Sequence, residues 1–147
     1  MTVTPRFALP LLATAQAQKE VTHNEALALI DALIQPLVEG GPHTVPPAAP
    51  GEGQCWLVGV GASGAWSGRD EAIAIWTEGG WRFVAPRDGM RVFRLDDGRW
   101  LRRATGSWVE AATLAGASGG GIVDAEARST LAALILILEA HGLLISG

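Results

Sequence analysis

The chain has 147 residues, enough for one ordinary hydrophobic core with helical extensions but not for two full domains. Apolar residues make up 48% of the sequence and charged residues only 18%, so we expect part of the surface to be buried between subunits. The formal net charge is −4, and the 11 basic residues are scattered. This balance excludes a nucleic-acid-binding surface, which needs concentrated Lys and Arg.

Residues 1–41 are predicted to form an N-terminal arm and a helix. The string Thr22-His23-Asn24-Glu25 fits a capping box, in which the Thr22 hydroxyl accepts from the backbone N–H of Glu25, so we expect the helix to begin there. Pro36 and the glycines at 40 and 41 end it. Apolar side chains recur at helical spacing, at Ala26, Ile30, Leu33 and Leu37. This stripe is expected to pack on the rest of the chain or on a neighbouring copy.

Residues 42–114 are predicted to form a small β domain. Four prolines between positions 42 and 50 disfavour a helix and predict a stiff, extended connector. From Cys55 to Val109, short apolar runs bounded by turn residues predict a compact antiparallel meander. The runs cover residues 55–58, 72–76, 81–84, 90–95 and 100–102.

All six Trp residues lie in this β domain, and four of them follow a Gly by two positions. Gly adopts the positive φ that a tight hairpin needs, so each Gly predicts a turn and each Trp a return into the sheet. Most of these side chains are expected in the core, but Trp also stacks on sugar faces. Three lie next to predicted hairpin tips and are the candidates for glycan contact: Trp66, Trp100 and Trp108.

Residues 115–121 are all Gly, Ala or Ser and predict a flexible linker that uncouples the last helix from the sheet. Within residues 122–147, Asp124 is expected to cap that helix and Gly142 to end it. Together with the first helix and the β domain, this pattern predicts an α+β fold.

The C-terminal helix is predicted to form oligomers. Its middle, Ile135-Leu136-Ile137, is apolar all round, so it is expected to bundle with identical helices or to dock onto a partner. The run from Leu131 to Leu138 is too short to cross a bilayer, which excludes membrane insertion. The residues expected to carry the contact are Ala127, Leu131, Leu134 and Leu138.

No group of residues predicts a metal site or a cofactor. His23, His43 and His141 lie in separate elements, and no pair of cysteines assists them. The single cysteine, Cys55, lies in an apolar run and is interpreted as a core residue rather than a nucleophile.

The patterns that resemble catalytic motifs are better explained as turns, so the chain is not expected to be an enzyme. The glycines at 59, 61 and 64 match G-x-G-x-x-G, but no helix follows, which favours a loop over a phosphate cradle. The carboxylate pairs Asp70-Glu71 and Asp96-Asp97 have the composition of turns. A glycan hydrolase that depends on Asp96 or Asp97 is the least favoured alternative.

Two N-terminal segments resemble a known family. Residues 4–10 (TPRFALP) and residues 16–27 (QAQKEVTHNEAL) are similar to the signature of DUF2793, a family of phage and prophage proteins also found in gene transfer agents. The resemblance continues through Pro46-Pro47 and residues 64–66 to about Pro86, and residues 123–128 and 141–143 resemble the ends of related particle proteins.

The resemblance implies a structural part of a head spike or tail fibre, on the surface of a phage-like particle that assembles in the bacterial cytoplasm. The short chain after the Trp-rich region implies a base or adaptor that holds a fibre. The implied partners are copies of the chain (five at a capsid vertex, otherwise three), capsid or tail proteins, a spike or fibre protein, and host surface polysaccharide. The polar motif expected to dock to the particle comprises Gln16, Gln18, Lys19, Thr22, Asn24 and Glu25. A carbohydrate-binding module that uses exposed Trp is the alternative.

Overall fold

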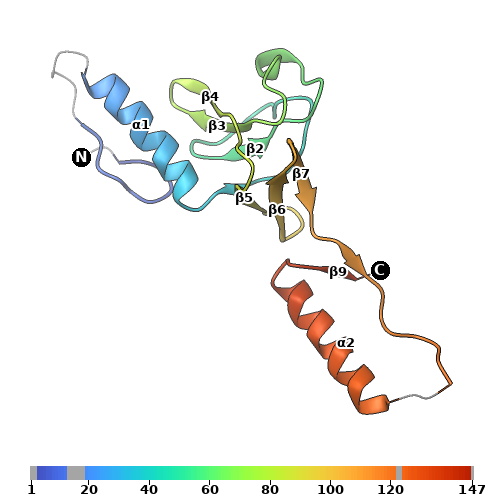
Figure 1. The fold of residues 1–147 in the computed structure, drawn as a ribbon. Coiled ribbons are helices and arrows are strands. Elements are labelled where there is room, and N and C mark those ends of the chain that lie inside the picture. The colour runs from blue at the N-terminus through green and yellow to red at the C-terminus, as the bar shows by residue number, and fades with distance from the viewer. Residues whose placement is uncertain (1–2, 13–18, 122–123, 147) are drawn as a thin grey trace.

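The computed structural model describes residues 3–12, 19–121 and 124–146, and it confirms an α+β fold. Figure 1 shows a body built from α1 and two small sheets, with α2 projecting from it. In chain order the elements are α1 (Lys19–Ile34), β1 (Leu37–Val38), β2 (Cys55–Leu57), the short 3-10 helix η1 (Gly64–Trp66), β3 (Ile73–Thr77), β4 (Gly80–Val84), β5 (Arg91–Arg94), β6 (Arg99–Ala104), β7 (Ser107–Glu110), β8 (Thr113–Leu114), α2 (Ala125–Ala140) and β9 (Ile145–Ser146).

The β domain contains one antiparallel sheet and one mainly antiparallel sheet, where a single meander is expected from the sequence. Strands β2, β3 and β4 form the first sheet, and β5, β6 and β7 form most of the second. The chain leaves the first sheet after Val84, where Pro86 cannot donate to a strand ladder. The second sheet also gains β1, which pairs in parallel with β5, Leu37 opposite Phe93. This parallel pair ties the N-terminal region to the second sheet.

Three of the four Gly-x-Trp motifs form hairpins as predicted. Gly98 and Gly106 have the predicted positive φ, 69° and 79°, at the β5–β6 and β6–β7 turns, whereas at the β3–β4 turn the positive φ, 93°, belongs to Gly80 and not to Gly79, the first Gly of that motif. The prediction is wrong for the fourth motif, because residues 64–66 form η1 and not a hairpin. Trp66 therefore does not lie beside a hairpin tip.

Helix α1 begins at Lys19, so the predicted start at Thr22 is wrong. Thr22 lies inside the helix, and Glu25 accepts from Arg82 of β4 at 2.6 Å and 2.9 Å instead of capping. The neighbouring Asn24 exchanges two hydrogen bonds with the backbone of Leu12 in the N-terminal arm. Contacts from distant parts of the chain, which local sequence does not reveal, replace the capping box.

The segment after α1 does not act as a spacer, contrary to the expected connector. Its backbone runs beside β2: Glu39 N donates to Cys55 O at 2.7 Å, and His43 N donates to Leu57 O at 2.9 Å. Gly59 N in turn donates to His43 O at 2.7 Å. Bends follow at residues 44–45 and 48–49, so the segment is not extended throughout, and the part before them pairs with β2 instead of separating it from α1.

Two clusters of buried side chains form the core. The first joins Ala32 of α1 and Val38 of β1 to both sheets and includes the fully buried Leu57 and Leu101. The second lies on the other face of the first sheet and is built around Trp. The rings of Trp56, Trp66 and Trp76 all pack edge-on against Trp81, with centroid distances of 5.6, 5.1 and 5.0 Å respectively.

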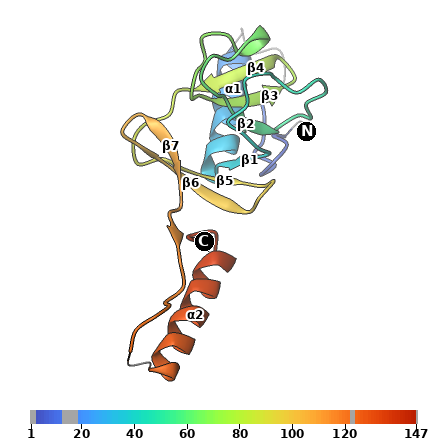
Figure 2. The same ribbon diagram turned by 90° about the vertical axis from the view of Figure 1, so that its right-hand side faces the viewer.

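Helix α2 has the predicted caps but is not uncoupled from the body. Asp124 accepts from Ala127 N at 2.8 Å, and Gly142 has a φ of 64° after the last turn. The carbonyl of Gly142 accepts from Trp100 N at 3.3 Å, and β8 pairs in parallel with β9. The exposed residues 115–121 therefore lead out along α2, which returns to the sheet, as Figure 2 shows.

Candidate interaction surfaces

The described residues contain no cluster of three or more His, Cys, Asp or Glu side chains that could hold a metal ion. His23 lies in α1, His43 in the segment beside β2, and His141 at the C-cap of α2. Within the same described residues, no helix is long and apolar enough to span a bilayer. Cys55 is 2% exposed in the first core cluster, and burial raises its pKa to about 11.

The first carboxylate pair has structural partners. Asp70 accepts from the backbone N–H groups of Gly61 and Ala62, at 3.2 and 3.4 Å, and so closes the glycine-rich loop on itself. Glu71 forms an ion pair with Arg103, which is 8% exposed. The amides that a phosphate cradle would use are thus bound by a side chain of the same loop, as expected for a structural loop.

The second carboxylate pair neutralises Arg94, which is 8% exposed. Arg94 donates to Asp97 and to Glu110 Oε1, the latter at 2.6 Å, and its Nη1 donates to Gly41 O at 2.9 Å. The hydrogen bonds from Arg94 hold the pKa of Asp97 below its ordinary value. A general acid needs a raised pKa, so Asp97 is suited to an ion pair and not to protonating a glycosidic oxygen.

The first candidate surface is α2. None of the 16 residues of this described helix is buried, and Leu131 and Leu134, two of the predicted contact residues, are 50% and 49% exposed. Ala127 is also exposed, while Leu138 is partly covered. Leu136 and Ile137 are more exposed still, at 66% and 56%. Apolar side chains therefore face solvent around most of the helix circumference.

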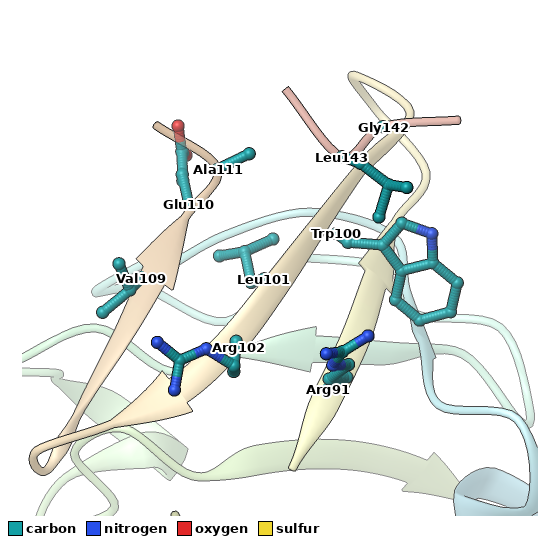
Figure 3. Close-up of a pocket in the computed structure, with 9 residues that line it drawn as sticks. All are labelled: Arg91, Trp100, Leu101, Arg102, Val109, Glu110, Ala111, Gly142 and Leu143. Carbon is teal, nitrogen blue, oxygen red and sulfur yellow. The ribbon is translucent and has the colours of Figure 1, made fainter. Parts of the chain in front are cut away.

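The second candidate surface is the outer face of the β5–β6–β7 sheet. Val92 and Leu101 point into the core at 0% and 1% exposure, so the alternate residues point outward. These outward residues are Arg91, Phe93, Trp100, Arg102 and Val109. A hollow of about 160 Å³ opens on this face, and Gly142 and Leu143 close one end of it (Figure 3).

The three Trp residues predicted to contact glycans have different environments. The prediction is wrong for Trp66, which is 0% exposed inside the Trp cluster and has no face left for a sugar. Trp108 is partly buried, donates from Nε1 to Glu71 O at 2.9 Å, and lies 5.8 Å from the Arg103 guanidinium. Only Trp100 of the three lines the open hollow.

The predicted docking motif falls partly outside what the structure describes. Gln16, Gln18 and the side chain of Lys19 lie outside the described residues, and Thr22 is exposed. Asn24 and Glu25 bind Leu12 and Arg82 within the chain. The structure therefore places Asn24 against the N-terminal arm and Glu25 against β4.

Asp31 is a structural residue that the sequence did not single out. It is 1% exposed and accepts from the Thr4 hydroxyl and from the backbone N–H groups of Arg6 and Phe7, at 2.7, 2.9 and 2.7 Å. Nothing in the neighbouring residues of α1 signals this role, because the three partners precede Asp31 by more than 20 positions.

The family model described as "Protein of unknown function (DUF2793)" matches residues 23–109, more than half of the chain. The chain belongs to the DUF2793 family. The matched region contains most of α1 and all of β1 to β6, and it ends within β7, so α2 and residues 16–22 lie outside it. No curated protein matches the chain. Both candidate surfaces thus involve residues at or beyond the C-terminal limit of the family region.

Proposed function

We propose that this DUF2793 protein is a non-enzymatic structural subunit that assembles through α2. The observation that carries the proposal is that α2 projects from the body with none of its described residues buried, although its middle is apolar all round (Figure 1). In the setting that the sequence resemblance implies, the subunit is the base or adaptor of a head spike or tail fibre on a phage-like particle.

The energetics of α2 support a packing partner. A 16-residue helix is marginal in water without tertiary contacts. Covering a Leu or Ile side chain stabilises by roughly 1.5–3 kcal/mol relative to leaving it exposed. Leu131, Leu134, Leu136 and Ile137 are all about half exposed or more, so covering them together would stabilise an assembly by several such increments.

The partner that we propose is α2 of further copies. Among the described residues, the helix meets the sheet near its C-terminal end, where Gly142 accepts from Trp100, and farther from the sheet it lies beside residues 114–119 (Figure 2). Copies placed around an axis bring such helices together while their bodies stay outside the bundle. Five copies fit a capsid vertex and three fit a fibre. In this arrangement the exposed Thr22 remains available for docking to the particle.

Light scattering at micromolar concentration tests assembly through α2. We expect the wild-type chain to form a discrete oligomer and the double variant Leu131→Asn/Leu134→Asn to dissociate at least about tenfold more readily. Thr130→Asn, on the same exposed helix, is the matched control and should assemble normally. A strictly monomeric wild-type chain would overturn the proposal.

The particle setting needs a separate test. Co-expression with the particle proteins, followed by reconstruction of the particle, should locate the subunit at a vertex or an appendage. The same Leu131→Asn/Leu134→Asn variant should reduce the number of spikes or fibres without reducing the number of heads and tails. Particles that assemble completely in the absence of this chain would contradict the adaptor role.

A further inference from the structure

We propose that the outer face of the β5–β6–β7 sheet binds a carboxylated sugar, with Arg91 and Arg102 holding the carboxylate and Trp100 contacting the sugar ring. The site is separate from the apolar surface of α2, so it goes beyond the proposed assembly function. Figure 3 shows the two arginines on neighbouring strands, with Trp100 farther along the same hollow.

The charges on β5 and β6 set these two arginines apart. The two strands carry five arginines, of which Arg94, Arg99 and Arg103 have carboxylate partners. Arg91 and Arg102 are exposed, and neither guanidinium has a hydrogen bond or an ion pair among the described residues. The protein neutralises the arginines of this sheet everywhere except at the hollow.

The strand register places Arg91 and Arg102 opposite each other, which does not help the sheet to fold. Arg91 and Arg102 are direct cross-strand partners, and like charges directly opposite each other destabilise a sheet. The same pair is well suited to an anion. Two guanidinium groups from adjacent strands can each present a planar fork of donors to one carboxylate, which is the geometry that makes Arg–carboxylate contacts strong and directional.

The hollow supplies an apolar surface beside the charges. The ring of Trp100 packs edge-on against Phe93 at 5.2 Å, which fixes its orientation, and Leu143 closes the end next to it. Val109, 43% exposed, lies opposite Arg102 on the third strand. The volume of about 160 Å³ corresponds to about five water molecules at ~30 Å³ each, which suits one small ring and not a helix.

The negative net charge of the chain favours a ligand with few, well-spaced negative charges over a dense polyanion. At −4, the protein repels a dense polyanion, and only the local arginine pair favours an anion. A saccharide with well-spaced carboxylates satisfies both conditions, since it brings one charge to the pair and a C–H face to Trp100. Nucleic acid brings a charge with every nucleotide and is disfavoured.

Titration with trigalacturonate and with sialyllactose tests the site, with the methyl ester of trigalacturonate as the uncharged counterpart. Binding is followed by NMR of the six indole N–H signals, with the Trp100 signal assigned from Trp100→Phe. We expect at least one of the two acidic sugars to move the Trp100 signal with a Kd of about 1 mM, and the ester to bind at least about tenfold more weakly.

Two variants distinguish binding at the hollow from nonspecific attraction to any surface arginine. Arg91→Gln/Arg102→Gln should weaken binding at least about tenfold. Arg87→Gln, which removes an exposed arginine outside the hollow, should leave binding unchanged. Thermal unfolding of the double variant should occur at or above the wild-type temperature, because the opposed charges are gone.

The proposal would be overturned if neither acidic sugar shifted the Trp100 signal at about 10 mM, or if the methyl ester bound as tightly as trigalacturonate. It would also be overturned if Arg87→Gln weakened binding as much as Arg91→Gln/Arg102→Gln. Equally tight binding of triglutamate would indicate an acidic peptide as the ligand instead. Light scattering of the same samples reports assembly independently. A chain that assembles but binds no sugar fails only this inference, and a monomeric chain that binds sugar fails only the assembly proposal.

Discussion

The hydroxyl of Thr4 donates a 2.7 Å hydrogen bond to Oδ1 of Asp31, a carboxylate that is 1% exposed. The same carboxylate accepts from the backbone of Arg6 and Phe7, so one side chain of α1 holds the N-terminal arm. The Arg6 guanidinium extends this contact by donating to Ala32 O at 2.9 Å and Gln35 O at 3.1 Å, near the C-terminal end of α1. The arm is thus part of the folded body.

Asp31→Ala should therefore destabilise the protein by about 2–4 kcal/mol, because it leaves three donors without their acceptor. The measurement is urea unfolding at neutral pH. Glu78→Gln, at an exposed position of the β3–β4 turn, is the control and should change stability by less than about 0.5 kcal/mol. Equal stabilities of Asp31→Ala and the wild type would show that the arm is not held by this carboxylate.

Trp81→Ala should be among the most damaging core substitutions, at about 3–5 kcal/mol, because three other Trp rings pack against this side chain. Trp81→Phe keeps an aromatic ring in place and should cost markedly less. Chemical unfolding followed by circular dichroism measures both, since the substitution itself alters Trp fluorescence. A loss in Trp81→Ala no larger than in Trp81→Phe would count against the role of this ring as the centre of the cluster.

The thiol of Cys55 should be unreactive in the folded protein. Burial raises its pKa to about 11 from 9.0, which lowers the thiolate fraction at pH 8 about 100-fold, and the side chain is 2% exposed. We expect modification by a disulfide reagent to be at least that much slower in buffer than in concentrated urea. Rapid labelling of the native chain would mean that the core around β2 opens readily.

Gly142→Ala should detach the end of α2 from the sheet. A Cβ at this position would lie 2.6 Å from the carbonyl oxygen of Gly98, and its φ of +64° is unfavourable for other residues. We expect faster proteolysis within residues 115–121 and faster exchange of the Trp100 amide, which donates to Gly142. Gly116→Ala, where a Cβ meets nothing within 4 Å, is the matched control. Identical proteolysis of both variants would contradict the anchor.

The elements that could be predicted from the sequence are those specified by local chemistry. Asp124 and Gly142 bound α2 as expected, because a cap acts on residues within one turn of itself. Gly98 and Gly106 mark hairpins for the same reason, since a tight hairpin turn depends on the backbone angles of its own few residues.

The features that were missed depend on partners far away in the sequence. The start of α1 was placed at Thr22 because no local signal shows that Glu25 pairs with Arg82, 57 positions later. Trp66 was expected near a surface because Gly64 precedes it, whereas three-dimensional packing buries it against Trp81. The sequence predicts only part of the outer sheet face. The alternation of apolar and polar residues predicts that Arg91 and Arg102 point outward, but only the strand register shows that they are neighbours.

The parallel pairing of β1 with β5 also constrains the order in which the molecule folds. Leu37 can meet Phe93 only after the loop that contains β2, β3 and β4 has closed, and closure of so long a loop costs chain entropy before any contact offsets it. The β3–β4 and β5–β6–β7 hairpins need no such closure. We therefore expect the hairpins to be formed in the folding transition state and the β1 contacts to form after it, so that substitutions at Val38 accelerate unfolding more than they slow folding.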